Sequence, residues 1–315
     1  MKNLTRNETG EFLRSHDNFC ILTHRRPDGD TLGSAAALCL GLRKLGKNAW
    51  VLNPTEPLDN LDWLLADVTK DFAEAGDTIL AVDVAAPNML PRDFAELADK
   101  CLLRIDHHGS CTPFAPEELV DAESASCAEI IYDLLTLLGV ELDEDIADAI
   151  YVGVSTDTGC FRYANTNAHA FLTASACAGA GADVAGLNLE LFETNSLAKL
   201  RLHAWIAEHV KIFGDGELAI VAIPKAVEES IGVTDAELGN LSSYARSIEG
   251  VCLAATLRQG KYGETKVSIR AVPGWDAAAV CARLGGGGHP GAGGATTRLS
   301  LEETAKLLEE YMLEA

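Results

Sequence analysis

Short apolar runs alternate with segments of helical periodicity over the first third of the chain. The runs are rich in β-branched residues and have the length of strands; they are NFCILTH, NAWVLN, TILAVD and CLLRIDHH. The segments between them predict helices at 31–46, near 58–66 and near 92–99. This alternation indicates an α/β domain with a mostly parallel sheet flanked by helices.

The pattern becomes helical from about 126 to 180, where apolar residues recur at spacings of three and four and predict helices that cap the sheet. Residues 187–213 contain no Gly or Pro, so we expect one long helix there that links two domains. The predicted boundaries are a first domain at 1–186, a helical linker at 187–213 and a second domain at 214–315.

The second domain is predicted to be a smaller α/β domain joined through that linker. Three strand-like runs occur in it, ELAIVAIP, VCLAATLRQ and TKVSIRAV. Helices are expected near 234–248, from about 275 and from 301, with a glycine-rich loop between the last two.

Composition and charge narrow the classes of function. Hydrophobic residues make up 48% of the 315 and charged residues 23%, which is typical of a folded globular protein. The 25 basic and 47 acidic residues give a net charge of −22, and such a field disfavours binding of long duplex nucleic acid. No segment has the ~20 apolar residues of a membrane span, and the nine cysteines form no CxxC pair. We therefore expect a cytoplasmic protein with buried thiols and no membrane partner.

The first candidate chemical cluster is THRRPDGD, which places His24, Asp28 and Asp30 between a strand and a helix. One imidazole and two carboxylates on a tight turn suit a divalent cation. The alternative is structural, because Asp is a frequent helix N-cap and PDGD is a good turn sequence. Taken alone, this segment leaves both interpretations open.

Polar residues also end three other elements. Asp83 follows the strand TILAVD, the Asp106-His107-His108 triplet ends CLLRIDHH, and Asp157 follows a helical segment. A single strand-end or helix-end Asp is more often a cap, whereas adjacent histidines after a buried strand favour a ligand. In open α/β sheets, ligands gather at the carboxyl ends of the strands. Two His and four Asp drawn from these clusters are enough for two adjacent metal ions.

The second domain carries a candidate substrate site. Period-two alternation in KVSIR puts Ser268 and Arg270 on one face of a strand, where Arg suits bidentate phosphate binding. The glycine loop, with Gly286, Gly287 and Gly288 before His289, permits close backbone approach and an anion-binding nest. The alternatives are a solvated strand face and a linker, although a linker is rare inside one domain.

The motifs THxxPDGD, the isolated strand-end Asp, DHH and TDTGxFRY resemble those of the DHH phosphoesterase family, in order and approximate spacing. KVSIR and GGGGHPGAGG resemble the DHH-associated second domain, so the resemblance covers nearly the whole chain. Within the family, the chain is similar to the nano-RNase and phosphoadenosine-phosphate phosphatase branch.

The resemblance implies a role for each matching residue. One metal would be held by His24, Asp28 and Asp83, and the second by Asp30, Asp83, His107 and Asp157. Asp83 would bridge the two ions, Asp106 would orient the histidines, and His108 would face the substrate phosphate. Mn²⁺ is the metal expected from the family, and Mg²⁺ or Co²⁺ are the alternatives.

Other residues are expected to contact the substrate. Arg162 and Tyr163 follow Asp157 closely and are candidates for phosphate and base contacts. Ser126 opens a helix, so it could cap that helix, bind a phosphate, or both. Two departures from the family pattern occur, since NAHAFL lacks an expected basic residue and SIRA lacks an expected Ser.

The resulting hypothesis is a metal-dependent phosphoric ester hydrolase that uses a two-metal bridging hydroxide. Its expected substrates are oligoribonucleotides of two to five nucleotides and 3′-phosphoadenosine 5′-phosphate. The alternatives are a linear di-adenylate phosphodiesterase of cyclic dinucleotide breakdown and a nucleotide sensor that does not hydrolyse its ligand. The sequence leaves a homodimer open.

Overall fold

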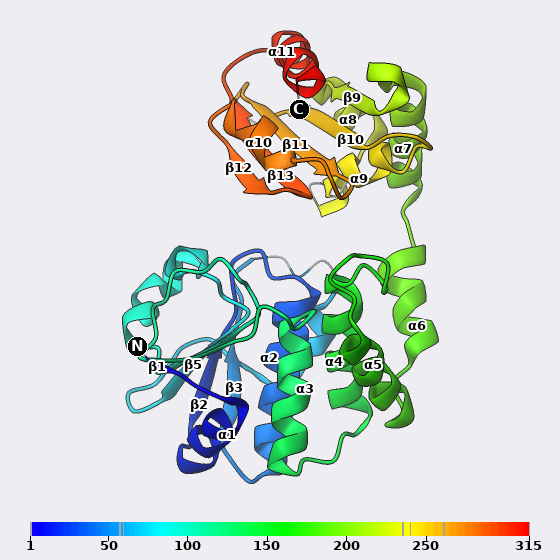
Figure 1. Cartoon of the computed structure of the whole chain (residues 1–315). Coiled ribbons are helices and arrows are strands. Elements are labelled where there is room, and N and C mark those ends of the chain that lie inside the picture. The colour runs from blue at the N-terminus through cyan, green and yellow to red at the C-terminus, as the bar shows by residue number, and fades with distance from the viewer. Residues whose placement is uncertain are drawn as a thin grey trace. The chain divides into compact units, whose positions relative to one another are not determined.

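The computed structural model describes residues 2–56, 58, 60–234, 236–239, 241–260 and 262–314, with the side chain of residue 236 excepted. The chain divides into two compact units, Met1–Thr194 and Asn195–Ala315. Figure 1 shows that each unit has its own sheet and its own helices. No helix in the described ranges is both long and apolar enough to cross a bilayer.

The first unit contains a seven-stranded sheet whose described pairings are all parallel, in the order β1-β7-β6-β5-β2-β3-β4. Its strands are β1 (Lys2–Asn3), β2 (Phe19–Leu22), β3 (Ala49–Leu52), β4 (Thr69–Lys70), β5 (Thr78–Val82), β6 (Leu103–Asp106) and β7 (Glu117–Val120). Its α-helices are α1 (Arg6–Ser15), α2 (Gly29–Lys44), α3 (Cys127–Leu138), α4 (Glu144–Asp157), α5 (Ala168–Gly179) and α6 (Val184–Asn188). The predicted α/β architecture with a parallel sheet is therefore confirmed.

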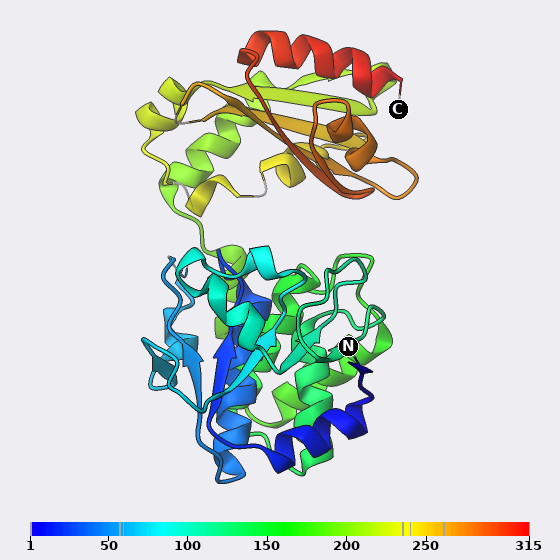
Figure 2. The same ribbon diagram turned by 90° about the vertical axis from the view of Figure 1, so that its left-hand side faces the viewer.

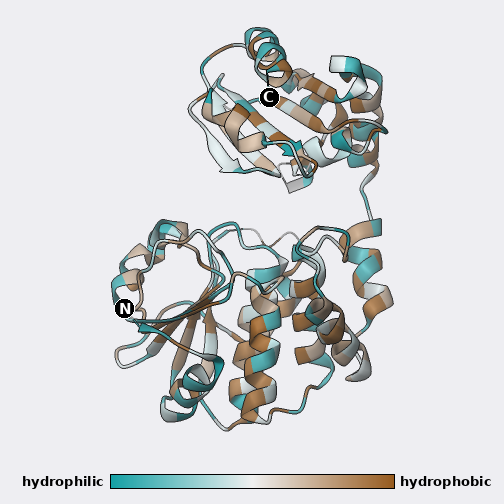
Figure 3. Cartoon of the chain, viewed as in Figure 1, coloured by the Kyte–Doolittle hydropathy of each residue, from teal (hydrophilic) through white to brown (hydrophobic). Residues whose placement is uncertain are grey.

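Successive residues of the central strands enter two different cores, as the pleat of a strand requires. Phe19 and Ile21 of β2 pack in the larger core with α1 to α4, whereas Cys20 and Leu22 pack in a smaller core on the other face. In Figure 3 these strands are mostly brown, while α3 carries both brown and teal residues. The strands are continuous apolar runs because both of their faces are buried.

Two of the helices expected in the first unit are 3₁₀ turns. The segment near 58–66 forms η1 (Asp62–Leu65), and residues 57 and 59 of that segment lie outside the described residues. The segment near 92–99 forms η3 (Arg92–Lys100), preceded by η2 (Pro87–Met89). Pro87 is the first residue of η2 and Pro91 directly precedes η3, and the fixed φ of proline favours such short, tight helical pieces.

The prediction of a single linker helix at 187–213 is wrong. Helix α6 continues into a π-helical turn at Leu189–Glu193, the chain is extended at Thr194, and α7 (Leu197–His209) begins anew. Ser196 caps α7 by accepting a hydrogen bond from the backbone N–H of Lys199 at 3.0 Å. Thr, Asn and Ser at 194–196 offer the backbone local partners that compete with a continuous helix. The boundary between the two units falls at this break.

The second unit has a six-stranded mixed sheet in the order β12-β13-β11-β10-β9-β8, in which only β9 and β10 pair in parallel among the described residues. Its strands are β8 (Lys211–Phe213), β9 (Leu218–Ile223), β10 (Leu253–Gln259), β11 (Thr265–Ala271), β12 (Gly287–His289) and β13 (Ala292–Thr297). The helices are α7, α8 (Lys225–Ile231), α9 (Leu241–Arg246), α10 (Ala277–Ala282) and α11 (Leu301–Leu313), with 3₁₀ turns η5 (Gly214–Gly216) and η6 (Ala236–Leu238).

Helices cover this sheet unevenly. Figure 2 shows α11 lying across one face, where Leu308 and Met312 join Val267 and Ile269 in the core. On the other face, α7 and α9 pack against β9 and β10. The expected helix near 234–248 is divided into η6 and α9, and residues 235 and 240 lie outside the described part.

The expected glycine-rich loop is in part a strand. Gly287, Gly288 and His289 form β12 and pair with β13, giving six strands where the sequence predicted three. A Cβ on Gly288 would lie 2.2 Å from the carbonyl oxygen of Ala292 in the neighbouring strand, so this glycine permits the close approach. The hairpin could not be predicted from strand propensities, because Gly is depleted in strands.

Helices α2 and α4 approach each other closely at Gly33, and this contact generates a stability prediction. A Cβ at Gly33 would lie 2.2 Å from the carbonyl oxygen of Ala149 in α4. Gly33→Ala is therefore expected to lower the free energy of unfolding by about 2 kcal/mol or more, because backbone has to move. Urea unfolding followed by circular dichroism measures this change.

Gly179→Ala is the matched control for that substitution. Gly179 is also helical, and nothing lies within 4 Å of a Cβ built there. Alanine should stabilise this position by up to about 1 kcal/mol, because it restricts the unfolded chain. Equal effects of the two substitutions would show that the α2–α4 contact is not tight.

Candidate metal centre

The carboxyl ends of β2, β5 and β6 bring the predicted polar residues together at one edge of the parallel sheet. Two groups there have ligand atoms within 4.8 Å of one another, namely His24, Asp28 and Asp83, and Asp30, His107 and Asp157. A third such group is Asp83, His107 and His108. The structure therefore places all six expected metal ligands in contiguous clusters.

Asp83 joins the two clusters. Its Oδ2 lies 3.5 Å from Nε2 of His24, and its Oδ1 lies 3.6 Å from Nε2 of His107. The residue is 2% exposed, and Oδ1 has no hydrogen-bond donor in the described structure. A buried carboxylate oxygen without a donor is costly unless a cation meets it. This orphan oxygen is the observation that fits the site to a metal.

The orientation of the two imidazoles also fits cation binding. Nδ1 of His24 lies 2.9 Å from the carbonyl oxygen of Arg25, and Nδ1 of His107 lies 3.4 Å from that of Ser124. Each imidazole can thus donate its Nδ1 hydrogen to a backbone carbonyl, which leaves Nε2 directed at the carboxylates. Metal-bound histidines commonly have this arrangement.

Asp28 and Asp30 have different local partners. Asp28 caps α2, since its Oδ1 accepts from the N–H groups of Asp30 and Thr31, both at 3.1 Å. That same Oδ1 lies 3.5 Å from Nε2 of His24, so the cap and the cluster share one carboxylate. Asp30 accepts from the N–H groups of Cys127 (2.7 Å) and Ala128 (2.9 Å) at the start of α3. The positive end of that helix favours its ionised form, but burial is the larger effect and raises the pKa of Asp30.

Asp157 ends α4, and its Oδ2 lies 3.5 Å from Nε2 of His107. The chain then turns through three consecutive residues with positive φ, Gly159, Cys160 and Phe161. Asn165 crosses this turn and donates to the carbonyls of Ala125 (3.0 Å) and Asp157 (3.2 Å). This left-handed turn could not be predicted from the residue types, because Cys and Phe rarely adopt positive φ.

Asp106 and His108 lie beside the clusters. Oδ1 of Asp106 accepts from the backbone N–H groups of His107 (2.8 Å) and His108 (3.2 Å), and it lies 2.8 Å from Nδ1 of His108. These contacts are those that Asp106 needs to orient the two histidines, the role expected for it. Nε2 of His108 is left for another partner.

The expected substrate residues of the first unit have different surroundings. Arg162 and Tyr163 are exposed, and Nε of Arg162 donates to the carbonyl of Gly159 at 2.5 Å. Ser126 is fully buried and caps α3 by accepting from the N–H of Glu129 at 3.1 Å. The structure thus shows the capping role of Ser126.

In the second unit, Ser268, Arg270 and His289 share one face of three adjacent strands. The register aligns Ser268 with Gly294 and Gly287, and Arg270 with Ala292 and His289. Ser268 and His289 are exposed, while Val267 and Ile269 point into the core. The alternation predicted for KVSIR is confirmed, and the glycines leave the polar face open.

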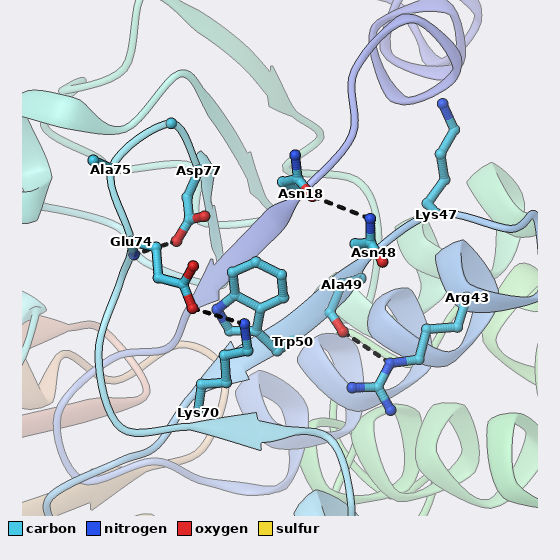
Figure 4. Close-up of a pocket in the computed structure, with 11 residues that line it drawn as sticks. Asn18, Arg43, Lys47, Asn48, Ala49, Trp50, Lys70, Glu74, Ala75 and Asp77 are labelled. Carbon is cyan, nitrogen blue, oxygen red and sulfur yellow. Dashed lines mark hydrogen bonds and ion pairs between the residues drawn. The ribbon is translucent and has the colours of Figure 1, made fainter.

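A separate pocket of ≈ 530 Å³ occurs at the amino-terminal edge of the first sheet, beside Trp50. Figure 4 shows that several polar side chains around it are paired with one another, as Lys70 with Glu74 and Asn48 with Asn18. Arg43 donates to the carbonyl of Ala49. These pairs are satisfied without a ligand, although Nε1 of Trp50 is a buried donor without a partner in the described structure.

Comparison with known proteins assigns the chain to a class. Residues 18–154 match the model of the DHH family, N-terminal domain, and residues 218–314 match that of the DHHA1 domain. The chain belongs to the DHH family and has both of these domains in the order that its motifs indicated.

Relatives cover both domains. The bifunctional oligoribonuclease and PAP phosphatase NrnA of Thermus thermophilus is 33% identical over 93% of this chain and 89% of its own. The Bacillus subtilis protein of the same name is 28% identical over 94% of each chain. An exopolyphosphatase-related protein from Bacteroides fragilis has the same fold, with a TM-score of 0.89 and 24% identity over 98% of this chain and 95% of that one. RecJ of T. thermophilus, solved with Mn²⁺, aligns at a TM-score of 0.58 and 14% identity over 100% of this chain and 55% of that one.

The clusters retain protons when no cation is bound. Burial lowers the pKa of His24, but hydrogen bonding and charge from Asp28 and Asp83 outweigh it and raise the pKa to about 11. Burial, followed by the charges of Asp30 and Asp28, raises the pKa of Asp157 to about 8. Burial and the charge of Asp30 raise the pKa of Asp83 well above its usual range.

These shifts predict that metal binding releases protons at pH 7. Ligand atoms must be deprotonated to bind a cation, and His24 and Asp157 are both mostly protonated at pH 7 when the metal is absent. The raised pKa of Asp83 acts in the same direction. Apparent affinity for Mn²⁺ should therefore rise as the pH increases through about 8. Calorimetric titration in two buffers of different ionisation enthalpy measures the protons released.

Asp157→Asn is the control for this measurement, since the variant has one fewer titrating ligand. It should release fewer protons per metal bound than the unmodified chain does. Heats that do not depend on the buffer would contradict the predicted linkage.

Proposed function

We propose that this chain is a divalent-metal-dependent phosphoric ester hydrolase acting on short oligoribonucleotides and on 3′-phosphoadenosine 5′-phosphate. The observation that carries the proposal is the shared Asp83 carboxylate between two imidazole-containing clusters, whose Oδ1 has no hydrogen-bond donor in the described structure. Membership of the DHH family and the activities named for the NrnA relatives support the substrate class.

Six residues would hold two cations, which we propose to be Mn²⁺. His24, Asp28 and Asp83 form one ligand set, and Asp30, Asp83, His107 and Asp157 form the other. When bound, such ions supply an activated water for attack on phosphorus and neutralise charge on the phosphoryl oxygens. His and carboxylate ligands are compatible with this metal and also with Mg²⁺ or Co²⁺.

The protein's own groups would position the reacting ester. His108, held at Nδ1 by Asp106, presents Nε2 for a hydrogen bond to a phosphoryl or leaving-group oxygen. Arg162 and Tyr163 are exposed and so are accessible for phosphate and base contacts. We assign Ser268, Arg270, Gly286, Gly287, Gly288 and His289 of the second unit to binding the part of the substrate that does not react.

Acidic charge on the whole chain agrees with small substrates. A net charge of −22 opposes binding to long polyanions, which depends on counterion release by basic residues.

A cyclic-di-AMP phosphodiesterase, GdpP of B. subtilis, is 24% identical over 96% of this chain and 49% of its own, so linear di-adenylate belongs in the substrate panel. The nine cysteines are free in the structure, which agrees with the reducing cytoplasm that we propose. Six of them are buried as expected, whereas Cys111, Cys160 and Cys252 are partly exposed.

A substrate panel tests this function directly. The full chain with Mn²⁺ should release phosphate from 3′-phosphoadenosine 5′-phosphate and mononucleotides from RNA of two to five nucleotides. Linear di-adenylate, pyrophosphate and a long single strand should be cleaved more slowly. Failure to turn over either principal substrate, in protein shown to hold two metals, would refute the proposal and favour a sensor.

Asp83→Asn tests the shared carboxylate. The amide cannot supply the negative charge between the clusters, so kcat should fall by about 10³-fold, which is of the order of removing a main electrostatic contribution to catalysis. Metal content should fall as well. Asp215→Asn, at an exposed turn of the second unit, is the matched Asp-to-Asn control at another residue with positive φ and should leave activity unchanged.

His289→Ala tests the polar face of the second unit. The side chain is exposed and aligned with Arg270, so its loss should raise KM several-fold and leave kcat within about twofold, as for removal of uniform binding. A lower kcat with unchanged KM would contradict a role in binding alone.

A further inference from the structure

Directly behind the acid of the D-H-H triplet lies a fully buried arginine, Arg104, on the same strand. Its Nη1 donates to Oδ2 of Asp106 at 2.6 Å, and its Nε and Nη2 donate to Oε1 and Oε2 of Glu118, each at 3.1 Å. The guanidinium also contacts the Val84 carbonyl (3.3 Å) and Cys111 Sγ (3.2 Å). All three nitrogens of the guanidinium therefore have partners.

The two oxygens of Asp106 serve different sides. Oδ2 faces Arg104, while Oδ1 accepts from the N–H groups of His107 and His108 and meets Nδ1 of His108. Arg104 and Asp106 are two residues apart on β6, so their side chains leave the same face of the sheet. A rotation of the carboxylate that improved one side would lose contacts on the other.

Glu118 prevents the arginine from following such a movement. It lies on the neighbouring strand β7, aligned with Arg104, and grips the guanidinium at two points. Paired hydrogen bonds of this kind fix direction as well as distance. The connected groups Glu118, Arg104, Asp106 and His108 thus transmit the geometry of two buried strands to the imidazole.

We propose that Arg104 is a positioning residue for phosphoester hydrolysis, which fixes the Asp106 carboxylate so that Nε2 of His108 is held toward the substrate. This inference rests on the proposed function. Stability alone is a poor reason for the group, because apolar side chains of similar volume often replace a buried ion pair without loss. A need to hold the Asp106 carboxylate in one orientation explains why these buried ion pairs are present.

A double-mutant cycle tests whether Arg104 acts through Asp106. Arg104→Lys retains the charge but loses the planar fork. In the unmodified background it should lower kcat roughly 10- to 100-fold, as is common for partners of metal-site groups, and leave KM within about threefold. In an Asp106→Asn background the same change should cost less than about threefold, because the group on which it acts is altered already. An equal loss of kcat in both backgrounds would overturn the inference.

Arg258→Lys is the matched control. Nε of Arg258 donates to Oε1 of Glu228 at 2.7 Å, and Glu228 is 1% exposed, so this is another arginine paired with a buried glutamate, located in the second unit. Its substitution should lower the unfolding midpoint and leave kcat unchanged. If Arg104→Lys behaves in the same way, the ion pair is structural and the inference is wrong.

A spectroscopic measurement covers the case in which Arg104→Lys folds poorly. Glu118→Gln weakens the grip on Arg104 from the far side and should lower kcat in the same direction, by a smaller factor. In ¹⁵N-histidine-labelled full chain loaded with diamagnetic Mg²⁺, the Nδ1–H signal of His108 should be protected from exchange and should be lost in either variant. The signal is assigned by its absence in His108→Gln.

Persistence of that signal in the variants would overturn the inference whatever the rates. If the unmodified chain hydrolyses neither principal substrate, the proposed function fails instead, and the His108 signal still decides whether Arg104 orients the imidazole.

Discussion

The shared carboxylate of Asp83 is the constraint on which the rest of the site depends. Its two oxygens face His24 on one side and His107 on the other, at 3.5 and 3.6 Å, so neither cluster can move without the other. The residue is buried and its φ is +57°, a conformation that few L-residues adopt. Burial and an unpaired oxygen are costly in the absence of a cation. The folded protein therefore bears a local cost in free energy at Asp83. A cation bound to this carboxylate would offset the part of that cost that comes from the unpaired oxygen.

The parallel sheet supplies the framework that maintains this arrangement. Strands β2, β5 and β6 are neighbours, so residues far apart in sequence leave the sheet at the same edge. Helix α3 adds its N-terminal N–H groups to Asp30, and Gly153 of α4 leaves room for this acid, since a Cβ there would lie 2.9 Å from Oδ1. The glycine at 153 is thus needed both for the close packing of the helices and for the position of the Asp30 carboxylate.

Much of this could be predicted from the sequence, and the exceptions have physical causes. The strand-end acids and histidines could be predicted as the site, because a parallel sheet brings the carboxyl ends of its strands to one edge. Asp28 both caps a helix and belongs to the ligand cluster, so the structural and the metal interpretation were not alternatives. The buried network was missed, yet its signal was present, because an Arg within the apolar run CLLRID must find partners once buried. Strand β12 and the break at 194–196 could not be predicted in the same way, since the strand depends on contacts with β13 and the break on local hydrogen bonds of Thr194 and Ser196.

Backbone conformation singles out the same edge of the sheet independently of side-chain chemistry. Eight non-glycine residues in the described structure have positive φ, and five of them are Asn or Asp, which tolerate this conformation. The three others are Arg26, Cys160 and Phe161. Arg26 lies between His24 and Asp28, and the other two follow Asp157, so all three flank proposed metal ligands. Strain that persists only where the surroundings enforce it is typical of functional sites. The backbone N–H of Arg26, tied at 2.7 Å to the Glu56 carboxylate, shows one way in which the surroundings enforce it here.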